Sequence, residues 1–219
     1  MFKRILVCAL ALTMMICMVG CGGQKMDANA DKAVLAYAEM IVQGESSNMT
    51  AAGISDADKD EIRKQFADSF VAGLSNIVPL TDESAKTLVE KFYARFKKDM
   101  KFSATLKKDD PEQPVVELKT TPMDNDAGAK ALAANNDFIA LLGMVGKLQS
   151  EGVTPDQLKS NAELQKLAIT AFTAYIDGIT FKSEQTFDVA CAKVKGSDGK
   201  MHWAPADMNV FTNFIMGQQ

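Results

Sequence analysis

The sequence predicts an α+β fold in which an antiparallel sheet of about four strands packs against several helices. Three observations support this class. Apolar residues recur every third or fourth position between residues 31 and 98, which is the period of helices. The period changes to alternation at Met100, and again after Phe181, as expected for half-buried strands. Both strand regions carry charge on one face, so the sheet should be antiparallel, with helices on its apolar side.

Three helices are predicted before the first strand. The first begins at Asp31 and ends at Gly44, a residue type that commonly terminates helices. The second covers about residues 58–78, where Ile62, Phe66, Phe70 and Leu74 share one face, and Pro79 follows it. Thr81 is expected to cap the third helix.

The middle of the chain is expected to form a hairpin and then two long helices. Residues 100–107 and the segment VVELKTT form the two strands, joined by the turn DDPEQP. One helix is predicted from about Asp126 to Gln149, and the next begins at Thr154 or Ser160 and ends at Asp177.

The last part of the chain is expected to form a second hairpin. Residues 181–195 are predicted as one long strand, GSDG as the turn and KMHWA as the returning strand, with Pro205 opening a short terminal helix. Helices followed by a strand pair therefore occur twice, which hints at a duplication. Alternation along TFDVACAKV and KMHWA places Cys191 and Trp203 in the core and His202 towards solvent.

The first twenty residues have the layout of an export signal. Lys3 and Arg4 precede an uncharged apolar run from Ile5 to Val19, and Gly20 and Cys21 follow it. A retained transmembrane anchor fits less well, because a spanning helix needs about twenty apolar residues. An ordinary secretory signal whose cleavage site borders a cysteine is the other alternative.

The segment MVGC resembles the lipobox of bacterial lipoproteins, although Met18 stands where leucine is commoner. This resemblance implies cleavage between Gly20 and Cys21, a diacylglyceryl (palmitate-type) thioether on Cys21, and a lipid-anchored protein on the extracytoplasmic face of the cell membrane. If the host has two membranes, transfer to the outer one is compatible with Gly22. The resulting organisation is a signal peptide at 1–20, a lipidated cysteine with a flexible tether at 21–30, and a single globular domain at 31–219.

The globular part resembles small bacterial lipoproteins of uncharacterised function with a cystatin-like fold or the cone fold of nuclear transport factors. The closing segment DGKMHWAPADMNVFTNFI is similar to the Gly-Lys-x-x-Trp ending of such domains, in which the tryptophan packs into the sheet. No catalytic residues come with this resemblance.

Composition and cysteine usage exclude several classes. The formal net charge is −4 and no basic stripe occurs, so a nucleic-acid binder is not expected. Cys8 and Cys17 would leave with the signal and Cys21 would carry lipid, so Cys191 is the one thiol left and no disulfide framework can form. A buried structural thiol is the favoured interpretation of Cys191.

No catalytic residue, metal site or cofactor is predicted. His202 is the single histidine, which excludes a histidine-rich zinc site. The segment DNDAG begins like a calcium loop but has Gly128 and Asn135 where further ligands are needed, so Asp126 is interpreted as a helix cap. The neighbouring acids Asp58 and Asp60, like those of the DDPEQP turn, are interpreted as solvated charge.

Two functions remain in view. The first is a non-enzymatic lipoprotein that binds an envelope protein, a peptide or a small apolar ligand, and reaches the membrane through Cys21. The second is a small envelope enzyme, a hydrolase or isomerase, that uses an aspartate together with Tyr93 or Tyr175 as an acid–base pair in a cone-shaped pocket. The first is favoured because apolar positions are plentiful and no catalytic set was found.

Overall fold

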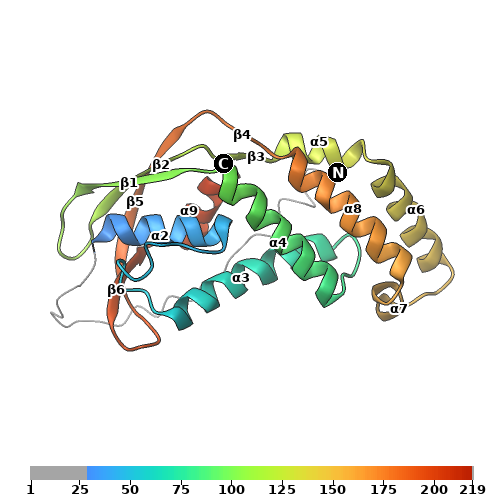
Figure 1. Cartoon of the computed structure of the whole chain (residues 1–219), viewed down its shortest axis with the longest axis horizontal. Coiled ribbons are helices and arrows are strands. Elements are labelled where there is room, and N and C mark those ends of the chain that lie inside the picture. Colours follow the sequence, from blue (N-terminus) through green and yellow to red (C-terminus); the bar gives the residue numbers. More distant parts are fainter. Residues whose placement is uncertain (1–28, 219) are drawn as a thin grey trace. The chain divides into compact units, whose positions relative to one another are not determined.

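A computed structural model describes residues 29–218 of the chain (Figure 1). It confirms the α+β class and the four-stranded antiparallel sheet. The described helices are α2 (Ala30–Gln43), α3 (Asp56–Ser75), α4 (Asp82–Asp99), α5 (Asn125–Ala133), α6 (Asn136–Ser150), α7 (Pro155–Lys159), α8 (Ala162–Gly178) and α9 (Met208–Ile215). The strands are β1 (Phe102–Lys108), β2 (Val115–Thr120), β3 (Met123–Asp124), β4 (Thr180–Phe181), β5 (Gln185–Lys195) and β6 (Met201–Pro205).

The described chain divides into two compact units. The helical unit contains Ala67–Arg95 and Met123–Phe181, and the sheet unit contains residues 29–66, Phe96–Pro122 and residues 182–218. Both α3 and α4 contribute residues to each unit. The prediction of a single domain over 31–219 stays a prediction.

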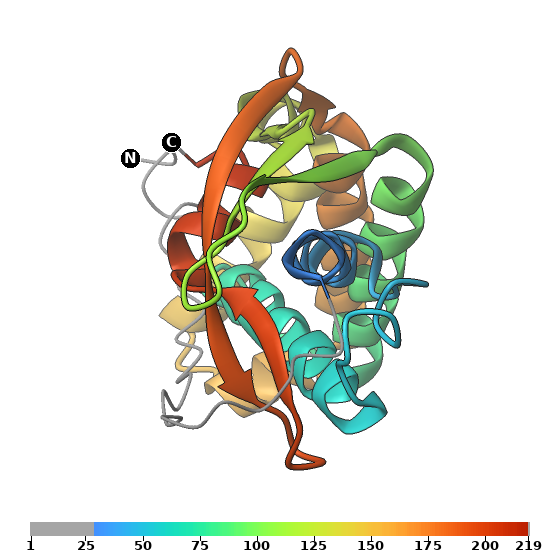
Figure 2. The same ribbon diagram turned by 90° about the vertical axis from the view of Figure 1, so that its left-hand side faces the viewer.

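The sheet unit is built around α2. This helix contacts all four strands of the sheet and α9, and Figure 2 looks along it (blue) as the strands curve past. Its sequence is rich in alanine, and one broad face of the helix is buried, whereas Lys32, Leu35 and Glu39 lie on the remaining side. The buried residues include Ala33, Val34, Ala36, Ala38, Met40, Ile41 and Val42. Gly44 ends the helix as predicted, with a left-handed φ of 69° that favours glycine.

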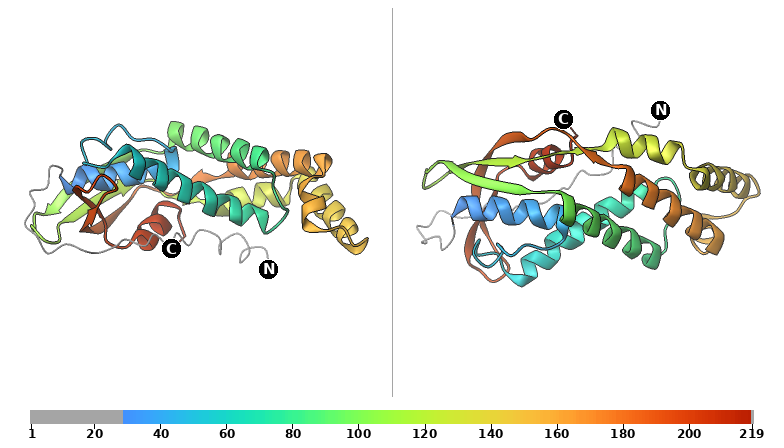
Figure 3. Two further views of the ribbon diagram at one scale, coloured as in Figure 1. Left: turned by 90° about the horizontal axis from the view of Figure 1, so that it is seen from below. Right: turned by 45° about the horizontal axis from the view of Figure 1, so that its top comes forward.

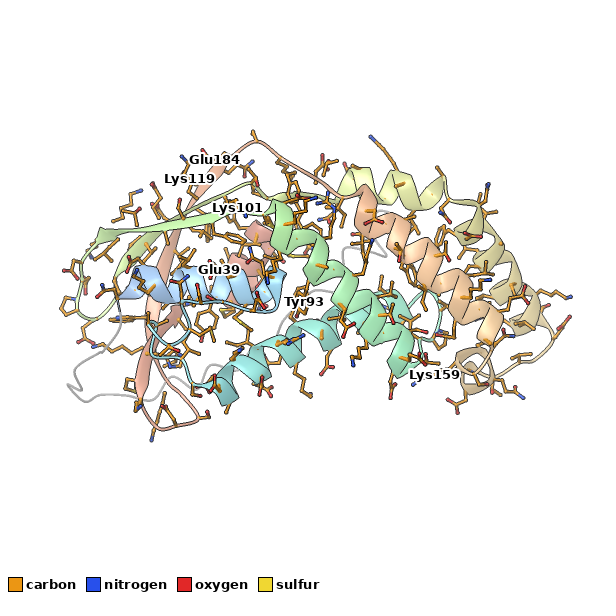
Figure 4. The ribbon with its side chains drawn as sticks, viewed as in Figure 1. Glu39, Tyr93, Lys101, Lys119, Lys159 and Glu184 are labelled. Carbon is orange, nitrogen blue, oxygen red and sulfur yellow. The ribbon has the colours of Figure 1, made fainter. Side chains whose placement is uncertain are left out.

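The sheet has the strand order β1-β2-β5-β6, and every neighbouring pair is antiparallel. The predicted charged face is present across β1, β2 and β5. The Lys107 ammonium lies 2.7 Å from the Asp188 carboxylate, and Lys119, labelled beside Glu184 in Figure 4, lies 2.8 Å from its carboxylate. The opposite face of the same strands buries Val116, Leu118, Val189 and Cys191.

The helical unit contains α5, α6, α7 and α8, together with parts of α3 and α4 and the short β3–β4 pair. The right-hand view of Figure 3 shows α5 (yellow) running beside α8 (orange), and both α5 and α6 contact α8. Gly128 permits the close approach of α5 to the end of α8. A Cβ atom on Gly128 would lie 2.7 Å from Ile179 Cγ1 and 2.9 Å from the Tyr175 carbonyl oxygen.

Several predicted boundaries are wrong. The helix expected over 126–149 is two helices, because the Asn135 side chain accepts a hydrogen bond from the Phe138 N–H and starts a new helix there. Asp124, not Asp126, caps α5. The helix expected to reach Val78 ends at Ser75.

The second hairpin also differs from the prediction at both ends. The expected strand over 181–195 is interrupted, since Phe181 belongs to β4 and pairs with Met123, whereas β5 starts at Gln185. Pro205 ends β6 instead of opening the terminal helix, whose cap is Asp207.

Candidate functional site

The predicted lipidation and cleavage site, Gly20 and Cys21, lies outside the described residues and stays a prediction. The first described helix begins at Ala30. Within residues 29–218, none of the helices combines the length and the apolar character that crossing a membrane requires.

Cys191 is buried in β5, as predicted, with no exposed surface. Its Sγ lies 3.7 Å from the Val189 carbonyl oxygen, in position to donate a weak hydrogen bond. Burial raises the pKa of the thiol to about 12. Because the thiolate is the nucleophilic form, this cysteine is held in its unreactive state at neutral pH.

The prediction that His202 faces solvent is wrong, since only 3% of its surface is exposed. Nε2 of the imidazole lies 3.2 Å from the Tyr37 hydroxyl of α2, and the two rings stack with their centroids 6.4 Å apart. Trp203, the next residue, is 6% exposed and is a core residue as predicted.

Both residues are buried because the β5–β6 hairpin is covered on both faces. Tyr37 of α2 covers the His202 face, while Phe214 of α9 stacks at 4.7 Å on Phe187, which lies on the Cys191 face of β5. The alternation of β5 shows the same change, because Val189 and Cys191 are buried in its first part and Val194, on the other face, near its end. Alternation assumes one solvated face, so it could not place His202 correctly.

The turn of this hairpin is bound to the start of α3 through Asp58. Its carboxylate accepts hydrogen bonds from the Ser197 N–H at 2.9 Å and from the Ser55 hydroxyl at 2.6 Å. The Ser55 and Ser197 hydroxyls are themselves 2.9 Å apart. Partial burial alone would raise the pKa of Asp58, but these hydrogen bonds outweigh it and lower the pKa.

The prediction that Asp58 is solvated charge did not include its hydrogen bond to Ser197. The spacing of Ser55 and Asp58 matches a helix-capping pair, and the Asp58 N–H does bond to the Ser55 hydroxyl at 3.2 Å, but this spacing does not indicate the distant partner Ser197. Gly196 completes the arrangement. A Cβ atom on Gly196 would lie 2.7 Å from Asp58 Oδ2 and 3.4 Å from His202 Cε1, so both side chains border this glycine.

Tyr93 and Tyr175, either of which was expected to pair with an aspartate in the enzyme hypothesis, lie in the helical unit. Tyr93 of α4, labelled in Figure 4, is buried with its ring edge-on to Phe92. The Tyr175 hydroxyl donates to Asn125 Oδ1 at 3.4 Å, and burial raises the Tyr175 pKa. The contact resolved for Tyr175 is therefore with an amide.

Metal-ligating side chains do not gather anywhere in the part of the chain that the structure describes, where no group of three His, Cys, Asp or Glu could hold an ion. In the DNDAG segment, Asp124 accepts the Asp126 N–H at 3.1 Å as the cap of α5.

An uncharged face of α6 is exposed. Ile139 keeps 58% of its surface in solvent and Leu142 keeps 37%. Gly143 and Gly146 lie on the same side, and a Cβ atom on either would meet no other atom within 4 Å. Large apolar residues with this exposure are uncommon among the described residues, so this face is a candidate contact surface.

No protein-family model matches the sequence, and no curated protein matches it. Among solved structures, the fold is similar to that of ycdA from Bacillus subtilis subsp. subtilis str. 168, a protein provisionally assigned as a lipoprotein. The two sequences are 16% identical and the TM-score is 0.54. The match covers 84% of this chain and 54% of the other, so the present chain spans about half the length of its structural neighbour. At this identity the likeness shows a shared fold and nothing finer.

Proposed function

We propose that this protein is a membrane-anchored extracytoplasmic lipoprotein that acts as a non-enzymatic binding module. The observation that carries the proposal is the segment MVGC directly after the apolar run Ile5–Val19, itself preceded by Lys3 and Arg4. The fold shared with a protein provisionally assigned as a lipoprotein supports it. We include in this proposal that the globular part has a cystatin-like fold or the cone fold of nuclear transport factors.

Cys21 is the anchor in this proposal. Signal cleavage between Gly20 and Cys21 leaves the cysteine at the amino terminus, with its thiol joined to a diacylglyceryl group. Each buried methylene contributes about 0.8 kcal/mol, and two acyl chains are enough for stable anchoring. The described part of the chain, whose first helix begins at Ala30, then stays close to the membrane surface.

A binding role is supported by how the chemically versatile side chains are used. Cys191 is fully buried with a raised pKa, His202 is buried against Tyr37, and Tyr175 bonds to Asn125. These groups pack and position the fold, and none of them is presented to solvent. The enzyme with an aspartate–tyrosine pair stays an alternative prediction.

The anchoring is tested by expressing the full chain in a bacterial host and measuring the intact mass of the membrane-bound product. Cys21→Ser should prevent acylation and leave an uncut or wrongly cut precursor. Cys17→Ser is the matched control, because it changes a cysteine of the preceding apolar run without touching the cleavage site, and it should be processed normally. A wild-type product that begins downstream of Cys21 and lacks lipid mass would contradict the proposal.

The binding role is tested with the full acylated protein in detergent, by adding fractionated envelope extracts and recording the melting temperature. A ligand that binds only the folded state raises the melting temperature in proportion to the logarithm of its concentration. The same compounds are then analysed by mass. A bound compound should be recovered unchanged, whereas conversion that is lost in Tyr93→Phe or Tyr175→Phe, with the fold intact, would favour the enzyme.

A further inference from the structure

The single histidine of the sequence occupies an unusual place in the sheet unit. His202 is buried on β6, with one ring nitrogen 3.2 Å from the Tyr37 hydroxyl of α2. Its other nitrogen, Nδ1, is also buried and has no hydrogen-bond partner in the described structure. A neutral imidazole tolerates this environment, but a protonated ring would hold a charge and an unsatisfied donor away from water.

The hairpin that carries His202 is held by a second contact at its turn. The Ser197 N–H and the Ser55 hydroxyl both bond to the Asp58 carboxylate at the start of α3. Gly196 lies beside both contacts. Because it has no Cβ atom, Asp58 Oδ2 and His202 Cε1 can both approach its Cα. The hairpin therefore closes over α2 through His202 and onto α3 through Ser197.

We propose that the β5–β6 hairpin is an acid-sensitive latch, closed on α2 and α3 while His202 is neutral and released when its imidazole takes up a proton. In either neutral tautomer the ring exchanges one hydrogen bond with Tyr37. The second proton gives the buried ring a charge, and water can solvate that charge only when the hairpin opens.

The direction follows from the groups around the ring. Asp58 of α3 and Asp198 of the turn favour the protonated form, whereas Tyr37 of α2 is neutral because burial raises its pKa. Burial of the imidazole outweighs the two carboxylates, so the pKa of His202 lies below its ordinary value of 6.5. The open hairpin then binds the proton more tightly than the closed one. The closed state loses stability as the pH falls through 6.5 towards the lower pKa of the closed state.

Opening of the hairpin can be followed in the full acylated protein at two residue types that each occur once in the sequence. Because the chain has one histidine and one tryptophan, the His202 ring proton is assigned without ambiguity by NMR, and Trp203 fluorescence reports the same strand. Amide exchange of the hairpin, corrected for the intrinsic effect of pH, should accelerate between pH 7.5 and 5.0 by up to about tenfold per pH unit, the limit for one proton. Exchange in α8 of the helical unit is the internal control and should stay unchanged.

Two variants separate a latch from a simple structural role. His202→Gln keeps a polar side chain that cannot titrate, so hairpin exchange should lose its acid acceleration. Asp198→Asn removes a carboxylate that favours the imidazolium, leaves the Asp58 contact in place and keeps a side-chain oxygen for the Lys200 N–H. The midpoint of the His202 resonance should therefore move to lower pH, and this variant decides the question if His202→Gln does not fold. Unchanged hairpin exchange between pH 7.5 and 5.0 would overturn the proposal. So would acid acceleration that persists in His202→Gln, or a His202 midpoint that Asp198→Asn leaves unmoved.

Discussion

Replacing glycine by alanine in the helical unit should raise the free energy of unfolding at two positions in α6 and lower it at one position in α5. Gly143→Ala and Gly146→Ala each add a methyl group to α6 where nothing lies within 4 Å, so the change acts only on the helix itself. Alanine is more favourable than glycine in a helix interior by about 0.5–1 kcal/mol. The double variant should therefore raise the free energy of unfolding by about 1–2 kcal/mol.

Gly128→Ala makes the same chemical change in α5 with the opposite result. The added methyl group would lie 2.9 Å from the Tyr175 carbonyl oxygen and 2.7 Å from Ile179 Cγ1. A side-chain atom can rotate away, but a backbone oxygen within α8 moves only with its helix. Overpacking of this kind costs about 1–3 kcal/mol, and the gain in helix propensity offsets about 1 kcal/mol of it. The expected net effect is a loss of up to about 2 kcal/mol.

Urea unfolding followed by circular dichroism measures both effects. The midpoint should move up for the α6 double variant and down for Gly128→Ala, with the slope of the transition unchanged. If the α6 double variant were as destabilised as Gly128→Ala, the exposed face of α6 would have to be covered in solution, for example by a second molecule. That result would refute the reasoning that the two α6 glycines face solvent.

Three further predictions concern the sheet unit and the whole chain. Trp203→Ala should lower the free energy of unfolding by about 3–5 kcal/mol, as truncation of a buried aromatic does, while Cys191→Ala should cost much less; chemical denaturation compares them, and a red-shifted, easily quenched tryptophan emission in the folded protein would contradict this burial. The Asp110 carboxylate accepts the N–H groups of Glu112 and Gln113 and binds the Lys108 ammonium, which lowers its pKa to about 2. The order it gives the β1–β2 turn should be present above its ordinary pKa of 3.8 and lost as the pH falls through about 2, and Asp110→Ala should lose it at neutral pH, as amide exchange of the turn would show. Treatment with a chelator should leave the melting temperature unchanged, and a decrease of several degrees would reveal a metal site.

The elements that local chemistry determines could be predicted from the sequence. Gly44 ends α2 because a left-handed residue there favours glycine, and the buried faces of α3 and of β2 follow from simple periodicity. The α+β class followed from the change of period at Met100, which no tertiary contact is needed to see.

Features that a continuing apolar pattern conceals, or that depend on tertiary contacts, could not be predicted. Asn135 separates α5 from α6 through a local cap on the second helix, but apolar residues continue on both sides of it and conceal the break. The burial of His202 depends on α2 and α9 covering opposite faces of one hairpin, and alternation within a strand carries no information about a second covering layer. Asp58 was misinterpreted for the same reason, since its partner Ser197 lies far away in the sequence.

The pairing of β2 with β5 has a consequence for synthesis on the ribosome. Thr120 pairs with Gln185, so β2 waits for its neighbour until the chain that forms α5, α6, α7 and α8 has been made. At about 5–20 residues per second this delay lasts several seconds. During that time the edge of β2, with Val116 and Leu118, has no strand to pair with and is open to aggregation. Faster translation of the segment between β2 and β5, or a chaperone that holds the first hairpin, should therefore improve the yield of folded protein.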